Sequence, residues 1–229
     1  MFQKAVICCV IVYFMKKELA ELVGILLGDG SIGVYKSIVN GKEKTQYRIK
    51  ITLNAIKDAD YADYVSDLMQ LVFGKRPIKT KRKFENTLDL CLFGRKHIEL
   101  LLRIGMKLSP KWQRATIPKQ FFTPTLSKLV LRGCIDTDGC VSNVYNNGIR
   151  YPRIELKICP SPMQSQLVNL LDFHGFKPQV TIMCGGEARV AICGLKKLQR
   201  WVNKIGFSNK RNLVAAAYFL PELNSGGRI

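Results

Sequence analysis

LVGILLGDG, at residues 22–30, is an apolar run that ends in Asp29 and a glycine, and LRGCIDTDG, at residues 131–139, repeats the pattern around Asp138. An apolar run stopped by glycine is typical of a buried helix, so we expect each aspartate in the last turn of one. Apolar residues would lie on every face of the first helix, which requires burial on all sides. The repetition at about half-chain spacing predicts a duplicated fold whose halves meet at these helices.

The elements predicted after the two motifs correspond in type and order. Each motif is followed by two β-rich runs around an Asn-Gly pair, a strong hairpin signal, and then by an amphipathic helical pattern that ends at glycine. A second hairpin and a short helix complete each half. The predicted turns and helix ends are Asn40-Gly41 and Asn147-Gly148, Gly74 and Gly175, Glu85-Asn86 and Gly185-Gly186, and Gly105 and Gly206.

This pattern predicts an α+β fold with two αββαββα halves related by an approximate two-fold axis. The equivalent motif helices would pair at the axis, and the antiparallel β-sheets would spread from it as a saddle. A segment with three prolines joins the halves. The expected organisation is an apolar extension at 1–15, a first half at 16–106, a linker at 107–124, a second half at 125–220 and a tail at 221–229.

Small residues lie one turn apart in each motif, Gly24 with Gly28 and Gly133 with Thr137. Such a stripe allows two helix backbones to approach more closely than the usual ~8–10 Å. The alternative is that the glycines only thin an ordinary core helix, although glycine in a helix interior is unfavourable without a packing reason.

The chain is strongly basic, because 36 lysines and arginines against 17 acidic residues give its 229 residues a formal charge of +19. The basic residues are dispersed along the sequence, which favours a polyanionic partner over a merely soluble basic protein. The eight cysteines contain no C-x-x-C pair and only two histidines are present, which disfavours a zinc site and a histidine-assisted nucleophile. The cysteines are better explained as small buried hydrophobes in a reducing compartment. Hydrolysis would therefore depend on carboxylates and a metal ion.

The N-terminus carries AVICCVIVYFM, at residues 5–15, an apolar run shorter than the ~20 residues that span a bilayer. It fits a segment packed on the body or poorly ordered, an upstream extension with Met15 as the natural start, or an export signal, although no small-residue cleavage site follows. No other run in the sequence is long enough to cross a membrane.

Two aspartates at the ends of paired helices would face the negative end of each helix dipole and one another. A divalent cation relieves both repulsions, and a partly open site built from oxygen ligands suits Mg²⁺. The alternative is that Asp29 and Asp138 are only solvated helix stops, a role that asparagine would fill without repulsion. The pair therefore indicates a metal site at the axis.

With these features the chain resembles the single-chain, two-motif LAGLIDADG homing endonucleases, whose family name spells the nine-residue motif. The resemblance extends from about residue 16 to about residue 220. It implies that Asp29 and Asp138, at the eighth motif position, bind metal. At the seventh position, Gly28 and Thr137 would each contribute a backbone carbonyl.

The sixth motif position departs from the family pattern in one half, where Leu27 replaces the aspartate that Asp136 retains. This position lies about 200° around the helix from the eighth, so we expect a difference in local packing and no effect on the metal. The family also places basic or polar residues around the cleavage centre. The candidates are Lys111 and Lys210, which follow the third helix of each half, and Lys57 and Lys157, which lie near the ends of the second strands. For each of them the alternative is an ordinary phosphate-contacting or solvated lysine.

The resemblance implies a metal-dependent, site-specific DNA endonuclease. It would act as an intracellular monomer on double-stranded DNA with a long, partly asymmetric target. One phosphodiester per strand would be hydrolysed across the minor groove, leaving short 3′ overhangs. Mg²⁺ is the expected cofactor, Mn²⁺ or another divalent ion would be able to replace it, and Ca²⁺ should support binding without cleavage.

Alternation along YRIKITLN places Arg48 and Lys50 on the face opposite Ile49 and Ile51. A β-ribbon with such a polar face fits the major groove, where Arg, Asn and Gln specify bases and most lysines contact the backbone. For each residue the alternative is the ordinary polar face of a half-solvated sheet. The predicted DNA-binding residues are Tyr35, Lys36, Arg48, Lys50, the stripe Lys79, Lys81 and Lys83, and in the second half Tyr145, Asn147, Arg150, Arg153, Lys157, Gln179, Thr181 and Arg189.

Three other functions fit parts of the pattern. An RNA maturase would keep the fold and bind its host intron RNA, a family-derived regulator would bind DNA without cutting it, and a basic ribosome-associated protein would need neither aspartate. Retention of both acids argues against the last two. Maturase activity stays open, because it can coexist with cleavage.

Overall fold

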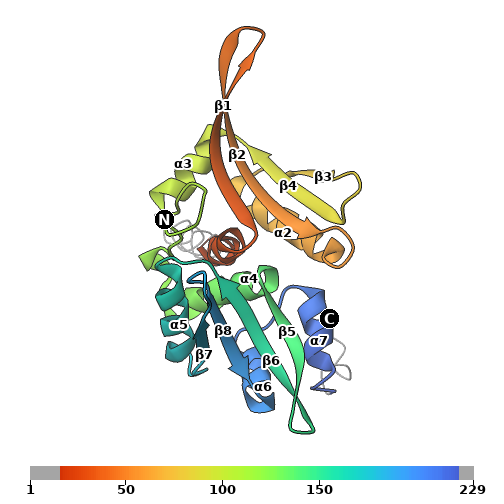
Figure 1. Cartoon of the computed structure of the whole chain (residues 1–229). Helices are drawn as coiled ribbons and strands as arrows, with labels where there is room; N and C mark the ends of the chain where they lie inside the picture. Colours follow the sequence, from red (N-terminus) through yellow and green to blue (C-terminus); the bar gives the residue numbers. More distant parts are fainter. Residues whose placement is uncertain (1–15, 222–229) are drawn as a thin grey trace, which may run out of the picture.

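The computed structural model describes residues 16–221. The predicted extension at 1–15, and residues 222–229 of the predicted tail, lie outside the described residues. The described chain forms two halves, each with a four-stranded antiparallel sheet that helices cover on one face (Figure 1). This is the predicted α+β fold, with the two motif helices packed together between the sheets.

The first half begins with the described part of the first motif helix, residues 16–27. Its sheet has the strand order β1-β2-β4-β3. The elements are β1 (Gly30–Val39), β2 (Lys42–Asn54), α2 (Ala59–Phe73), β3 (Ile78–Lys81), β4 (Thr87–Phe93) and α3 (Arg95–Arg103).

The second half repeats this order from the second motif helix, and its sheet runs β5-β6-β8-β7. Its elements are α4 (Pro124–Thr137), β5 (Gly139–Asn146), β6 (Ile149–Ile158), α5 (Met163–Phe173), β7 (Gln179–Ile182), β8 (Ala188–Cys193) and α6 (Leu195–Lys204). A short 3₁₀ helix, η1 (Lys119–Phe121), and a final helix, α7 (Lys210–Ala217), are additions that we did not predict. The signal for α7 is Asn209, whose side chain accepts a hydrogen bond from the Arg211 N–H at 3.0 Å.

Both predicted Asn-Gly turns are confirmed, with positive φ at both residues of each turn. The second hairpins turn in five-residue loops, 82–86 and 183–187, and the second of these contains the predicted Gly185-Gly186 turn, with Gly186 at φ +79°. In the first of these the chain reverses around Phe84, at φ +62°, and not at Glu85-Asn86. The Arg82 N–H closes that loop on the Thr87 carbonyl at 3.0 Å. A dipeptide without glycine gave no reliable signal for where this turn would centre.

The two motif helices pack with their glycines in contact. A Cβ atom added at Gly24 would collide with the carbonyl group of Val130, and one added at Gly133 would collide with that of Glu21. The predicted close approach is therefore confirmed. The space that each glycine leaves is filled by the backbone of the partner helix.

One ion pair crosses this helix interface. Arg132 of α4 donates from Nε to the Glu21 carboxylate at 3.0 Å and makes a second hydrogen bond from Nη2, and Glu21 is 3% exposed. Ser208 donates to the same carboxylate at 2.7 Å. At the equivalent motif positions stand Val130 and Val23, so the pair has no symmetric copy.

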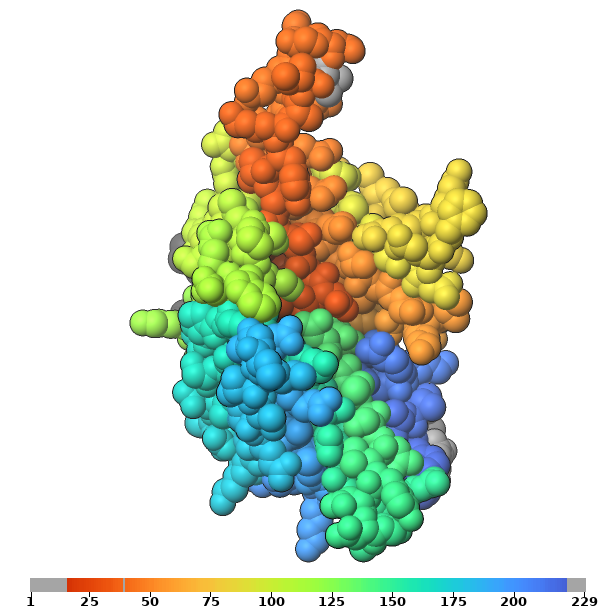
Figure 2. All heavy atoms as spheres, viewed as in Figure 1, coloured from red at the N-terminus to blue at the C-terminus, as the bar shows by residue number. Residues whose placement is uncertain are grey.

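Side chains of each sheet alternate between a helix-covered face and an open face. On β2, Ile49 and Ile51 are fully buried, and Arg48 and Lys50 lie on the open face, as predicted. The β1–β2 hairpin has strands of 10 and 13 residues, and its tip projects beyond the body (Figure 2). Among the helices of residues 16–221, none has the length and apolarity to cross a membrane.

Candidate active site and DNA-facing surface

Asp29 and Asp138 lie together where the two motif helices end. Asp29 follows the first helix, and Asp138 is the C-terminal cap of α4. In each half the chain passes directly from helix to strand, and a Cβ atom at Gly30 or Gly139 would overlap the last turn of the helix. The repeated Asp-Gly therefore places two carboxyl groups side by side at the axis, where each affects the pKa of the other.

Both carboxyl groups titrate above their ordinary range. Burial, and after it the charge of Asp138, raises the pKa of Asp29 to about 7 against an opposing effect of Lys111. Desolvation also raises the pKa of Asp138, and Lys111 again opposes the shift. Two neighbouring acids that resist ionisation form a site that a cation stabilises.

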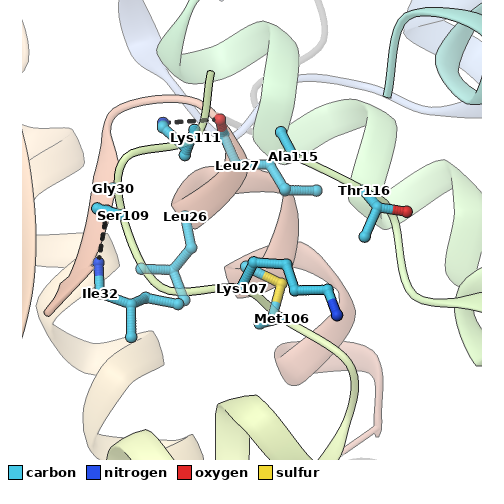
Figure 3. A pocket seen from close by; sticks show the side chains of 10 residues that line it. All are labelled: Leu26, Leu27, Gly30, Ile32, Met106, Lys107, Ser109, Lys111, Ala115 and Thr116. Carbon is cyan, nitrogen blue, oxygen red and sulfur yellow. Dashed lines mark hydrogen bonds between the residues drawn. The ribbon is translucent and has the colours of Figure 1, made fainter. Parts of the chain in front are cut away.

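Lys111 brings a positive charge to the end of the first motif helix. Its Nζ donates to the Leu27 carbonyl oxygen at 2.8 Å (Figure 3). It also donates to the Gly28 carbonyl oxygen. The segment that carries Lys111 is fixed by Ser109, whose N–H donates to the Ile32 carbonyl oxygen at 2.8 Å. The structure thus brings one of the two predicted lysines to the acid pair.

Lys210, the second predicted lysine, lies apart from the acids. Its Nζ is 3.6 Å from the carboxylate of Asp60 at the start of α2, and both side chains are exposed. The place equivalent to that of Lys111 is taken by Asn209, whose Nδ2 donates to the Asp136 carbonyl oxygen at 3.0 Å. Lys210 is displaced because α7 begins at this residue and carries it to the flank of the molecule.

Asp136 explains the difference between the motifs at the sixth position. It is fully buried, and its carboxylate accepts from the Ser208 N–H at 2.6 Å and from Asn212 Nδ2 at 3.0 Å. These bonds fix the first turn of α7 and the segment before it on α4. Leu27, at the equivalent position, instead lines an apolar crevice against the linker. The expected difference in local packing is confirmed.

A cavity of about 280 Å³ lies beside Asp138, and its lining includes Gly28, Lys111, Lys157 and Cys159. This space is several times the ~30 Å³ that one water molecule occupies in the liquid, so it can admit a hydrated ion or a phosphate group. The crevice behind Lys111, seen in Figure 3, holds about 10 Å³ and is too narrow for either.

The donors at the axis fit a hard divalent ion. They are the carboxylates of Asp29 and Asp138 and the carbonyl groups at the helix ends, of which that of Gly28 already accepts from an ammonium group. Within residues 16–221, no three His, Cys, Asp or Glu side chains gather as a complete metal cage. An oxygen-only set completed by water or phosphate oxygens is the arrangement that Mg²⁺ prefers.

The open face of the first sheet carries Tyr35, Arg48 and Lys50, as predicted. The Arg48 guanidinium lies over the Tyr35 ring, 4.5 Å from its centre. In the strand register Lys50 lies opposite Ser31 of β1 and Cys91 of β4, on this same open face.

The predicted lysine stripe on β3 is wrong. Lys79 and Lys81 are paired with leucines of β4 on the helix-covered face, and Lys79 makes an ion pair with Asp63 of α2. Lys83 lies in the loop that follows β3. Because β3 is an edge strand with solvent on both sides, its polar pattern did not reveal which face points to the helices.

Three more predicted DNA-binding residues lie on the helix-covered face of their sheets and not on the open face. They are Lys36, Tyr145 and Arg150. Lys36 makes an ion pair with Glu43 at 2.7 Å, and Arg150 donates to the Tyr218 hydroxyl at 3.4 Å. These outer parts of the hairpins are exposed on both faces, so polarity did not distinguish one face from the other.

The open face of the second sheet is also basic. Arg153 and Arg189 flank Glu155, at 3.4 and 3.6 Å. Asn147 lies in the hairpin turn. The predicted residues on this face are Arg153, Lys157, Gln179, Thr181 and Arg189.

Sequence reasoning missed several open-face residues. Lys44, Gln46 and Tyr151 lie on these faces, and the Asn-Gly turns would have revealed them, because a two-residue turn fixes the strand register. Asp89 also lies on the open face, and its carboxylate accepts hydrogen bonds from Arg82 at 2.8 and 3.1 Å. No feature of the sequence indicated this position.

Known proteins share this sequence pattern and architecture. The profile of the LAGLIDADG DNA endonuclease family matches residues 20–173. The chain is similar to I-DmoI in complex with DNA and Mn, with 17% identity and a TM-score of 0.56 over 85% of this chain and 98% of that one. It is also similar to I-SmaMI bound to uncleaveable DNA, with 10% identity and a TM-score of 0.61 over 89% of each chain. For the I-LtrWI LAGLIDADG homing endonuclease bound to target DNA, the identity is 11% and the TM-score 0.59, over 92% of this chain and 90% of that one. No curated protein matches the chain.

Proposed function

Because the chain belongs to the LAGLIDADG DNA endonuclease family, we propose that it is a site-specific enzyme that hydrolyses one phosphodiester bond in each strand of a DNA duplex. The observation that carries the proposal is the pair of neighbouring carboxyl groups of Asp29 and Asp138 beside Lys111. A protein that only binds DNA gains nothing from two acids whose repulsion costs stability.

Four residues at the helix ends would hold divalent ions: Asp29 and Asp138 through their carboxylates, and Gly28 and Thr137 through their backbone carbonyls. When bound, such an ion lowers the pKa of a coordinated water and stabilises charge on the attacking and leaving oxygens. Mg²⁺ or Mn²⁺ would support cleavage, and Ca²⁺ would support binding alone. I-DmoI has been solved with DNA and Mn and also with DNA and Ca.

The open sheet faces would contact the duplex inside the cell. A two-stranded ribbon fits the major groove, and there Arg48, Arg153 and Gln179 would specify bases while Lys50 and Lys157 contact phosphates. The two faces carry different side chains at equivalent positions, so the target would be partly asymmetric. Both motifs belong to one chain, so the enzyme would act as a monomer.

The test is plasmid cleavage. A duplex target is first selected by binding from a randomised library and cloned into a supercoiled plasmid. Wild type should linearise this plasmid with Mg²⁺ and leave it intact with chelator. Asp29→Asn and Asp138→Asn keep the shape of the side chain and remove a charged ligand, so cleavage should collapse while binding survives.

Asp60→Asn is the matched control, because Asp60 is exposed at the start of α2 and pairs with Lys210. This variant should cut like wild type. Cleavage by wild type in chelator, or double-strand breaks by Asp138→Asn at the wild-type rate, would contradict the proposal.

A further inference from the structure

The two motif helices end against different chemical groups. Lys111 donates to the Leu27 and Gly28 carbonyl oxygens at the first helix end. At the second, Asn209 donates to the carbonyl oxygen of Asp136, which is the motif position equivalent to Leu27. An ammonium group and a neutral amide therefore fill equivalent places, and only the first carries a charge.

The ammonium group of Lys111 acts on both acids. Its Nζ is hydrogen-bonded to the carbonyl oxygen of Gly28, the residue directly before Asp29, and Lys111 lines the same cavity as Asp138. Asp58 adds a further negative charge that acts on Asp29. Lys111 also satisfies the Gly28 carbonyl oxygen, which is one of the proposed metal ligands.

We infer that Lys111 is the internal counter-ion of the acid pair and that it competes with a divalent ion for the first helix end. The inference rests on the proposed metal site. Without metal, the ammonium group of Lys111 balances the negative charge of the acid pair and binds the Gly28 carbonyl oxygen. Removal of this group leaves the two carboxylates and the Gly28 oxygen available to an added divalent ion. Asn209 carries no charge, so the two helix ends differ in their response to a divalent ion.

Lys111→Gln tests this directly, because glutamine offers the amide donor that Asn209 uses and removes only the charge. Calorimetric titration of the full chain with Ca²⁺, without DNA, should show roughly fivefold tighter binding by the variant than by wild type. In chelator the variant should unfold at a lower temperature than wild type, and saturating Ca²⁺ should remove most of this difference.

Lys107→Gln is the control, because Lys107 is an exposed lysine of the same segment. It should match wild type in both measurements. Equal Ca²⁺ affinities of wild type and Lys111→Gln would overturn the inference and leave the metal site standing. If the unfolding temperature of Lys111→Gln stays below that of wild type even in saturating Ca²⁺, Lys111 is only a structural cap of the helix, and the inference is also overturned. If neither protein responds to Ca²⁺, the metal site and the inference fail together.

Discussion

Arg132 of α4 and Glu21 of the first motif helix form an ion pair across the interface between the halves, with the Glu21 carboxylate buried. Valines stand at the equivalent positions, so this pair forms only between unlike motif helices. A buried charge is tolerated where its partner is present and is costly where the partner is missing. The pair therefore favours this one pairing of the two halves.

Arg132→Leu should leave the Glu21 charge buried and unpaired, which costs ~3–5 kcal/mol of unfolding free energy in urea titrations. The double variant Glu21→Leu/Arg132→Leu should recover most of that loss. Arg76→Leu, which breaks an exposed ion pair with Asp67, should change little. Equal stability of the single and double variants would show that the burial of an unpaired charge is not the cause.

Gly24→Ala and Gly133→Ala should each destabilise the protein by ~1–3 kcal/mol, because the new methyl group meets backbone atoms of the partner helix that have no room to move. The melting temperature should fall by roughly 2–4 °C for each kcal/mol. Gly185→Ala is the control, since a Cβ atom there meets nothing within 4 Å. A melting temperature unchanged in both motif variants would be incompatible with the close helix contact.

DNA binding should depend on the open sheet faces and not on the helix-covered ones. If about ten phosphates are contacted, log K should fall with log salt at a slope near −9, and Lys50→Ala should reduce this slope by about 1. Lys79→Ala should leave affinity and slope unchanged, because Lys79 faces α2. Anisotropy titrations between ~50 and ~200 mM salt measure both. A slope shallower than roughly −3 would rule out docking through both sheets.

Asp89 should contribute stability that depends on pH. Burial raises its pKa, but hydrogen bonds from Arg82 and from Thr52 outweigh that effect, so the pKa lies below the ordinary 3.8. The folded state then binds fewer protons than the unfolded state, so the contribution is complete above this value and is lost as the pH falls through the folded-state pKa. Asp89→Asn should lower the urea midpoint near neutral pH, and its difference from wild type should shrink in acid. A difference that stays constant in acid would refute the assignment.

The repeated motif and the hairpin turns were sufficient to predict the order of elements shared by the two halves, because glycine and Asn-Gly signals are local, but they did not predict η1 or α7. The pairing of Asp29 with Asp138 was also predictable, since a duplicated helix must meet its copy. The positions of Lys111 and Lys210 were not. They occupy similar sequence contexts, yet helix α7 starts at Lys210 and removes it from the axis. The sheet face of Lys79 and Lys81 was also not predictable, because they lie on the edge strand β3, which is exposed to solvent on both faces.

The β1–β2 hairpin is held at its tip by backbone pairing and by the turn at Asn40-Gly41. Most of its outer side chains are exposed, so a substitution there costs the core little. An enzyme with a fixed target must change its recognition surface whenever that target drifts by mutation. If the proposed DNA contacts hold, such adaptation is separated from folding in this protein, and new specificities would arise first at the hairpin tip.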